Sequence, residues 1–213
     1  MKKLILALAI IMSAATVLPV SVNADNVAKE QKQNRKDAQK NAKKRAKKLK
    51  KEGWQVQGSL DDEIALTKHC QKLAEFGGNG TEVIGEVMGK KKVRVAVSEA
   101  RAEAVRKYAE EQHMAVKGKI TDAVGDMSEV EIENFMNAFT ALYTTEIKGE
   151  LQQSLQYVRE RNGLYDVQVF FVVDIDKANS AAVRALKQTA EKQKLAIEVA
   201  RSIEEWINDD SSN

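Results

Sequence analysis

The feature that most constrains the fold is a pair of apolar stretches joined across an Asn-Gly dipeptide. The stretches cover residues 151–159 and 164–174, and Asn162-Gly163 lies between them. Asn-Gly is the strongest short hairpin signal, because both turn residues must accept a positive φ. Around Phe170 the second stretch is apolar at odd and even positions alike, as in strands covered on both faces. We therefore predict an antiparallel hairpin whose second strand is central in its sheet.

The other periodic segments predict further strands and helices around this hairpin. Alternation predicts strands at 54–57 and 81–88, and helical spacing predicts helices at 60–76, 92–124, 128–149 and 177–208. Together these segments predict an α+β fold, an antiparallel sheet of about four strands covered by helices. A projecting N-terminal basic helix and a long C-terminal helix complete the predicted architecture.

Single residues refine these elements. Ser59 with Asp62, and Ser128 with Glu131, have the spacing of capping boxes that begin helices. Gly85 stands inside a predicted strand, which indicates a bulge or the close approach of another backbone. The many alanines of the predicted helix at 92–124 would let that helix lie close on a sheet.

The first 24 residues have the pattern of a secretory signal. Lys2 and Lys3 precede a short apolar core, Leu4–Met12, and small residues lead to Ala24. The core is too short to span a bilayer; a retained anchor is the alternative. The mature chain would begin at Asp25 and contain 213 − 24 = 189 residues. We predict an exported protein, periplasmic or secreted, that is soluble after cleavage of the signal.

Charge divides the predicted mature chain in two. Residues 25–52 contain twelve Lys or Arg and four Asp or Glu, a net charge of 12 − 4 = +8. The whole chain is +3 and the signal is +2, so residues 53–213 carry 3 − 2 − 8 = −7. We therefore predict three parts: a signal peptide at 1–24, a basic helical arm at 25–52 and an acidic α+β domain at 53–213.

The basic arm is the sharpest candidate for binding. A basic segment joined to an acidic domain indicates what the protein could bind more than how it folds. Docking on an anionic envelope surface or an acidic protein is one interpretation, and a solvated spacer is the other. Export and the lack of an aromatic platform argue against nucleic acid. The candidate docking residues are Lys43, Lys44, Arg45, Lys47, Lys48, Lys50 and Lys51.

Other polar motifs favour structural roles. His69-Cys70 lies at the apolar stripe of a predicted helix, so core packing is favoured over metal or thiol chemistry. Asp174-Ile175-Asp176 precedes a helix and favours capping, with Asp176 or Asn179 as the cap. The glycines at 77–80 follow a helix, the reverse of a phosphate loop, and predict a helix stop. We predict no catalytic residues, no metal and no cofactor.

Two stretches resemble known envelope proteins. The sequence KEGW at 51–54, after a signal and a basic segment, resembles the start of uncharacterised exported Gram-negative envelope proteins. Residues 83–111 and 155–174 resemble the LPP-twenty-like envelope lipoprotein family, whose fold is similar to the N-terminal domain of a flagellar assembly protein. The resemblance implies helices layered on an antiparallel sheet and implies no reaction. Unlike that family, this chain has no lipobox cysteine; its single cysteine is Cys70.

These observations predict a non-enzymatic envelope protein of interaction or structural type. The alternative is an enzyme with an unrecognised pocket between helices and sheet. A homo-oligomer, in which the helix at 26–52 packs on the 177–208 helix of a neighbour, is a third interpretation.

Overall fold

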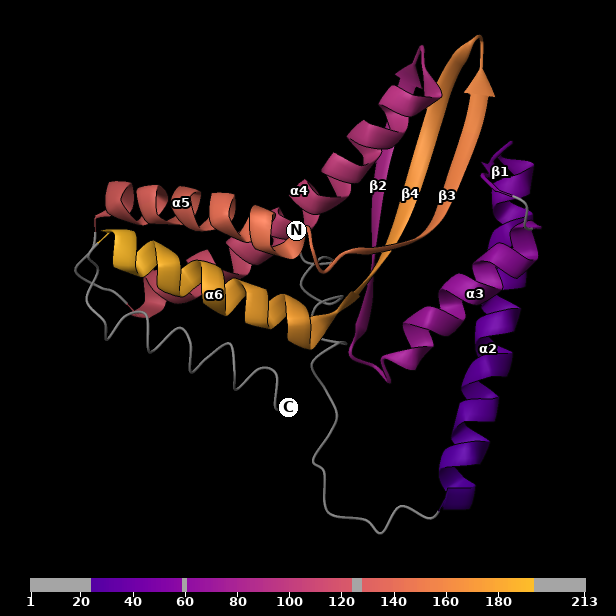
Figure 1. The fold of residues 1–213 in the computed structure, drawn as a ribbon, viewed down its shortest axis with the longest axis horizontal. Coiled ribbons are helices and arrows are strands. Elements are labelled where there is room, and N and C mark those ends of the chain that lie inside the picture. The colour runs from indigo at the N-terminus through magenta and orange to yellow at the C-terminus, as the bar shows by residue number, and fades with distance from the viewer. Residues whose placement is uncertain (1–23, 59–60, 124–127, 194–213) are drawn as a thin grey trace.

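The structure is a computed structural model, and it describes residues 24–58, 61–123 and 128–193 (Figure 1). Five helices and four strands occur in this part of the chain. In chain order they are α2 (Ala24–Lys51), β1 (Gln55–Val56), α3 (Asp62–Glu75), β2 (Gly80–Lys90), α4 (Val93–Ala123), α5 (Glu129–Ile147), β3 (Gln152–Arg161), β4 (Leu164–Asp174) and α6 (Ile175–Gln193). The predicted α+β class is confirmed.

The four strands form one antiparallel sheet in the order β1-β3-β4-β2. The predicted hairpin is β3–β4, and its turn residues Asn162 and Gly163 have φ values of 54° and 73°. β4 is an inner strand, and both Phe170 and Phe171 on it are buried. The predicted central strand is therefore confirmed, because neighbouring residues of β4 face opposite covered sides.

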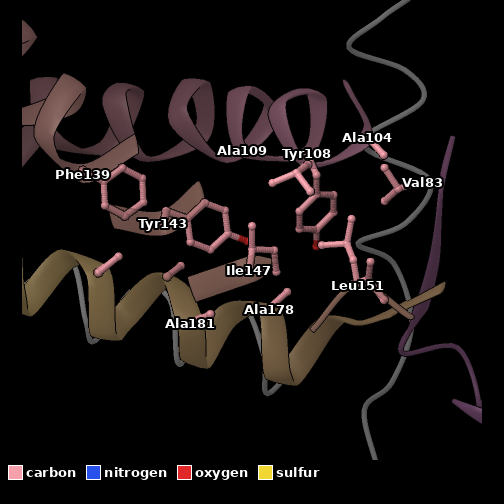
Figure 2. Packing of buried hydrophobic residues seen from close by; sticks show 14 of the residues in the cluster. Val83, Ala104, Tyr108, Ala109, Phe139, Tyr143, Ile147, Leu151, Ala178 and Ala181 are labelled. Atoms are coloured by element: carbon pink, nitrogen blue, oxygen red, sulfur yellow. The ribbon is translucent and has the colours of Figure 1, made fainter. Parts of the chain in front are cut away.

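One face of the sheet is covered by α4, which then continues beyond the sheet and packs against α5, while α6 packs on the other side of α5 (Figure 1 and Figure 2). A Cβ atom at Gly85 of β2 would lie 1.8 Å from the carbonyl oxygen of Ala100 on α4. The prediction of a close backbone approach at Gly85 is thus confirmed. Figure 2 shows the helical part of this core, where the rings of Phe139 and Tyr143 stack with centroids 5.7 Å apart.

The opposite face of the sheet is covered by α2 and α3. Ala42, Ala46 and Leu49 of α2 are buried with Trp54 in a second apolar core that also contains residues of α3, β3 and β4. The basic segment at 25–52 was predicted to project from the domain, and its last three turns do not. Because a stripe of small and apolar residues lines one side of the helix, these turns pack on the sheet face instead of standing in water.

The residues that cap the first turns of the helices confirm some sequence predictions and correct others. Ser128 and Glu131 form the predicted capping box of α5. Helix α3 begins at Asp62, and the carboxylate of Asp61 accepts from the Glu63 N–H, so Asp61 is its cap; Ser59 lies outside the described residues. At α6 the Asp174 carboxylate accepts from the N–H groups of residues 176 and 177, so the capping role predicted for Asp174-Ile175-Asp176 is confirmed at Asp174, and neither Asp176 nor Asn179 is the cap.

The C-terminal helix is present as α6 from Ile175 to Gln193. Its predicted continuation to residue 208, with the acidic segment there, lies outside the described residues, as does the predicted signal at 1–24 apart from Ala24.

Candidate functional site

The six predicted docking lysines lie on the outer side of α2, and all are exposed. Helical spacing arranges them in two stripes, at positions 43, 47 and 50 and at positions 44, 48 and 51. None of their ammonium groups pairs with a carboxylate among the described residues. We call Lys43, Lys44, Lys47, Lys48, Lys50 and Lys51 the lysine face. Within the described part of the chain, its positive charge has no carboxylate partner.

The seventh predicted residue, Arg45, does not belong to this face. Its Nη1 and Nη2 donate to the two carboxylate oxygens of Glu82 on β2, at 2.7 and 3.0 Å. The guanidinium also lies over the ring of Phe170, 4.7 Å from the centroid. The prediction that Arg45 reaches an external partner is therefore corrected. Its planar group matches a carboxylate in a paired arrangement that lysine cannot make.

His69 of α3 extends the same network across the sheet face. The ring is 1% exposed and contacts the Glu82 carboxylate through Nε2. Its Nδ1 lies 2.6 Å from the hydroxyl oxygen of Ser154 on β3, and the ring meets Phe170 edge-on. A buried imidazole with both nitrogens bonded links α3 to two strands. The predicted core position of His69 is confirmed, and its polar partners were not predicted.

Ser154 is the bulge residue of β3. The register with β4 shifts between Gln153 and Leu155, so Ser154 is the unpaired extra residue. Bulges redirect single side chains, and here the hydroxyl turns to His69 while it also donates to the Phe170 carbonyl at 3.2 Å. A serine hydroxyl has only one hydrogen. When this hydrogen is donated to the Phe170 carbonyl oxygen, the hydrogen in the contact with His69 must come from Nδ1. In this arrangement the bulge residue of β3 anchors the histidine of α3.

Burial and hydrogen bonding act in opposite directions on the charge of Glu82. Burial favours the neutral acid, but the hydrogen bonds from His69 and Arg45 outweigh it and hold the pKa of Glu82 below its ordinary value. Cys70, one residue after His69, is half-buried. Burial raises the pKa of its thiol, against an opposing effect of Arg45. Cys70 is therefore a protonated thiol at neutral pH, as its predicted packing role requires.

A second ionic cluster fixes the end of α2. The guanidinium of Arg159 on β3 stacks over the ring of Trp54 at 4.2 Å and donates to the carbonyl oxygen of Glu52 at 3.1 Å. Asp166 accepts from Arg159, from Arg161 and from the Gly89 N–H. Burial alone would raise the pKa of Asp166, but these donors together lower it. The last turn of α2 is thus held to the hairpin by charge and by an aromatic contact.

Sequence reasoning missed Glu82, the residue that joins α2, α3 and β2. One signal was available: within the apolar stretch at 81–88, Glu82 shares a strand face with Ile84, so a charged group stands on a covered side. The glycines at 77–80 end α3 as predicted, with φ values of 59° and 100° at Gly77 and Gly78. In the described ranges, no group of three or more His, Cys, Asp or Glu residues is arranged to hold a metal ion.

No protein family, curated protein or solved structure matches this chain. The resemblance to the LPP-twenty-like lipoproteins therefore stays a prediction. Among the described helices, none combines the length and apolar character needed to cross a membrane.

Proposed function

We propose that this chain is an exported, non-enzymatic envelope protein of interaction or structural type, which docks on an anionic surface through the lysine face of α2. The observation that carries the proposal is the two-sidedness of this helix. Its outer side presents six exposed lysines, while its inner side is buried in the apolar core against α3 and the sheet. Cations that have no carboxylate partner among the described residues gain from any anionic surface large enough to contact several of them at once.

The domain holds the lysine face rigidly, and a flexible arm would not. Leu49, Trp54 and the Arg45–Glu82 ion pair fix the last turns of α2 to the sheet. A preorganised set of charges loses less conformational entropy on binding than a disordered segment does. Each lysine close to an anionic surface contributes about 1 kcal/mol, and salt screens this contribution.

The test is sedimentation of the protein with vesicles that contain phosphatidylglycerol. Replacing the six lysines of the lysine face by Gln should lower partitioning at least about a hundredfold at low salt, since each tenfold step corresponds to about 1.4 kcal/mol. The matched control replaces Lys148, Lys177 and Lys192, which are exposed on or beside α5 and α6. Unchanged vesicle binding in the six-lysine variant would refute the proposal.

The alternative function, an enzyme, is favoured by the contact between Ser154 and His69. A separate groove between α2 and α3 is lined by Gln39, Thr67 and Gln71. A serine-directed fluorophosphonate probe decides between the two: covalent labelling that is lost in Ser154→Ala would support an enzyme, and absence of labelling is expected from our proposal.

A further inference from the structure

The registers of the sheet bring three separate segments to one of its ends. The β3–β4 turn at residues 162–163 marks this end, and Lys90, the last residue of β2, pairs with Tyr165 just after the turn. β1 pairs Gln55 with Val158, four residues before the turn, so α2 finishes in the half of the sheet nearer the turn, set back from the hairpin tip (Figure 1). The hairpin turn and the connection from β2 to α4 therefore lie at one end of the sheet, and the last turn of α2 lies toward the same end on the face opposite α4.

Cations are in surplus at this end. Lys91, Lys92 and Arg94, from the connection and first turn of α4, are exposed and make no ion pair with a described residue. No acidic residue occurs in the first turn of α4. Lys50 and Lys51 of the lysine face lie on the α2 side. We call Lys50, Lys51, Lys91, Lys92, Arg94 and Arg161 the basic end.

Most carboxylates near the basic end are already neutralised. Glu99 is paired with Lys90 at 2.6 Å, and Asp166 is enclosed by Arg159 and Arg161. Glu52, Glu86 and Glu160 are exposed acids here. Arg161 already pairs with Asp166, so five cations of the basic end face three exposed acids, which leaves a net charge of 5 − 3 = +2.

Two large apolar side chains are exposed near this end of the sheet, Met88 on the strand face opposite α4 and Val95 on α4 itself, next to Arg94. Met88 of β2 is 54% exposed and Val95 of α4 is 43% exposed. Both lie at a similar height along the sheet, measured from the contact of Gly85 with Ala100. Met88 is three strand residues, about 10 Å, toward the basic end, and Val95 is five helical residues, about 7.5 Å, in the same direction.

We propose that the basic end is a bilayer-docking surface, in which its cations contact anionic lipid headgroups while Met88 and Val95 enter the interfacial region. This inference rests on the proposed function and names its partner as a lipid bilayer. Cations beside exposed apolar side chains fit the headgroup boundary of a membrane, where both kinds of group are stabilised. A polyanion in solution would contact the lysines but would gain nothing from Met88 and Val95.

The first experiment measures partitioning of the full chain onto phosphatidylglycerol-containing vesicles. The double variant Met88→Ser, Val95→Ser should partition about tenfold less, because the apolar area it removes no longer leaves water. The matched control is Met114→Ser, Val130→Ser, which removes side chains that are 70% and 69% exposed on α4 and α5. Equal loss in both variants, or loss in neither, would overturn the inference.

The second experiment locates the contact. An environment-sensitive fluorophore on Met88→Cys, in a Cys70→Ser background, should shift to shorter wavelength when the same vesicles are added. The label on Met114→Cys in that background should not shift. A shift at position 114 alone, or at neither position, would contradict docking through the basic end.

A third set of variants separates this inference from the proposed function. The triple variant with Lys91→Gln, Lys92→Gln and Arg94→Gln should bind vesicles more weakly and with a smaller salt dependence than the control variant at Lys148, Lys177 and Lys192. If the six-lysine variant of α2 loses binding while both basic-end variants bind like the original protein, the docking role of α2 stands and the inference fails. If the basic-end variants alone lose binding, the inference stands and the α2 proposal fails.

Binding to soluble polyphosphate tests a different partner. If the triple charge variant binds polyphosphate more weakly while the Met88→Ser, Val95→Ser variant still binds vesicles like the original protein, the partner is a polyanion and the inference fails.

Discussion

Glu82 accepts two hydrogen bonds from Arg45, at 2.7 and 3.0 Å, and so joins α2 to a strand that lies 37 residues further along the chain. Glu82 also contacts His69. One carboxylate therefore connects both helices on this face of the sheet to β2. The consequence is that a helix with a high positive charge behaves as part of the domain.

The first prediction concerns this carboxylate. Glu82→Gln should lower the free energy of unfolding by about 2 kcal/mol, because it leaves the guanidinium of Arg45 without its counter-charge in a half-buried site. The measurement is urea unfolding at neutral pH. Glu86→Gln is the control, since Glu86 is exposed on the same strand and bonds to Gln168. An equal effect of the two substitutions would show that the network around Arg45 does not stabilise the fold.

Acid should weaken the same network. The pKa values of Glu82 and Asp166 are lowered from ordinary values of 4.5 and 3.8. A carboxylate whose pKa is lowered in the folded state stabilises the protein at pH values above its ordinary pKa. This contribution is lost as the pH falls through the folded-state pKa. The free energy of unfolding should therefore fall below about pH 4.5. In Glu82→Gln the acid-induced loss should be smaller; an unchanged loss would exclude Glu82 as a contributor.

A third prediction tests whether the end of the basic helix belongs to the domain. Leu49 is 7% exposed in the core formed by α2, α3 and the sheet. Leu49→Ala should lower the free energy of unfolding by about 2–3 kcal/mol, as truncation of a buried leucine does. Lys47→Ala, on the outer side of the same helix, should change it by less than about 0.5 kcal/mol. Thermal unfolding of the two variants checks the contrast, which a projecting arm would not show.

Two glycines, Gly85 on β2 beneath α4 and Gly118 inside α4, give a fourth prediction. Gly85→Ala places a Cβ atom 1.8 Å from the Ala100 carbonyl oxygen, so α4 must move away from the sheet. We expect a loss of about 3 kcal/mol or failure to fold. Gly118→Ala, inside α4 with no atom within 4 Å of the added Cβ, should instead stabilise the protein by about 0.5–1 kcal/mol. Circular dichroism during denaturation measures both, and destabilisation by Gly118→Ala would contradict the account of α4.

The sequence by itself determined the features that arise within a few residues. Asn162-Gly163 specifies the hairpin turn, Ser128 with Glu131 begins α5, and the α+β class follows from the periodic segments. These features could be predicted because steric limits on φ and the bonding of helix N–H groups act locally. The caps of α3 and α6 were misplaced by two residues or more, since neighbouring acidic residues compete for the same N–H groups.

The tertiary structure alone decided which charges face outward. A run of lysines and one arginine looks uniform in sequence, yet the position of β2 selects Arg45 for an internal ion pair and leaves the lysine face in water. The sheet order, in the same way, brings Lys91, Arg161 and Lys51 to one end although they are far apart in the chain. Pairing between distant segments depends on how strands and helices pack, and a local pattern of residues does not contain that information.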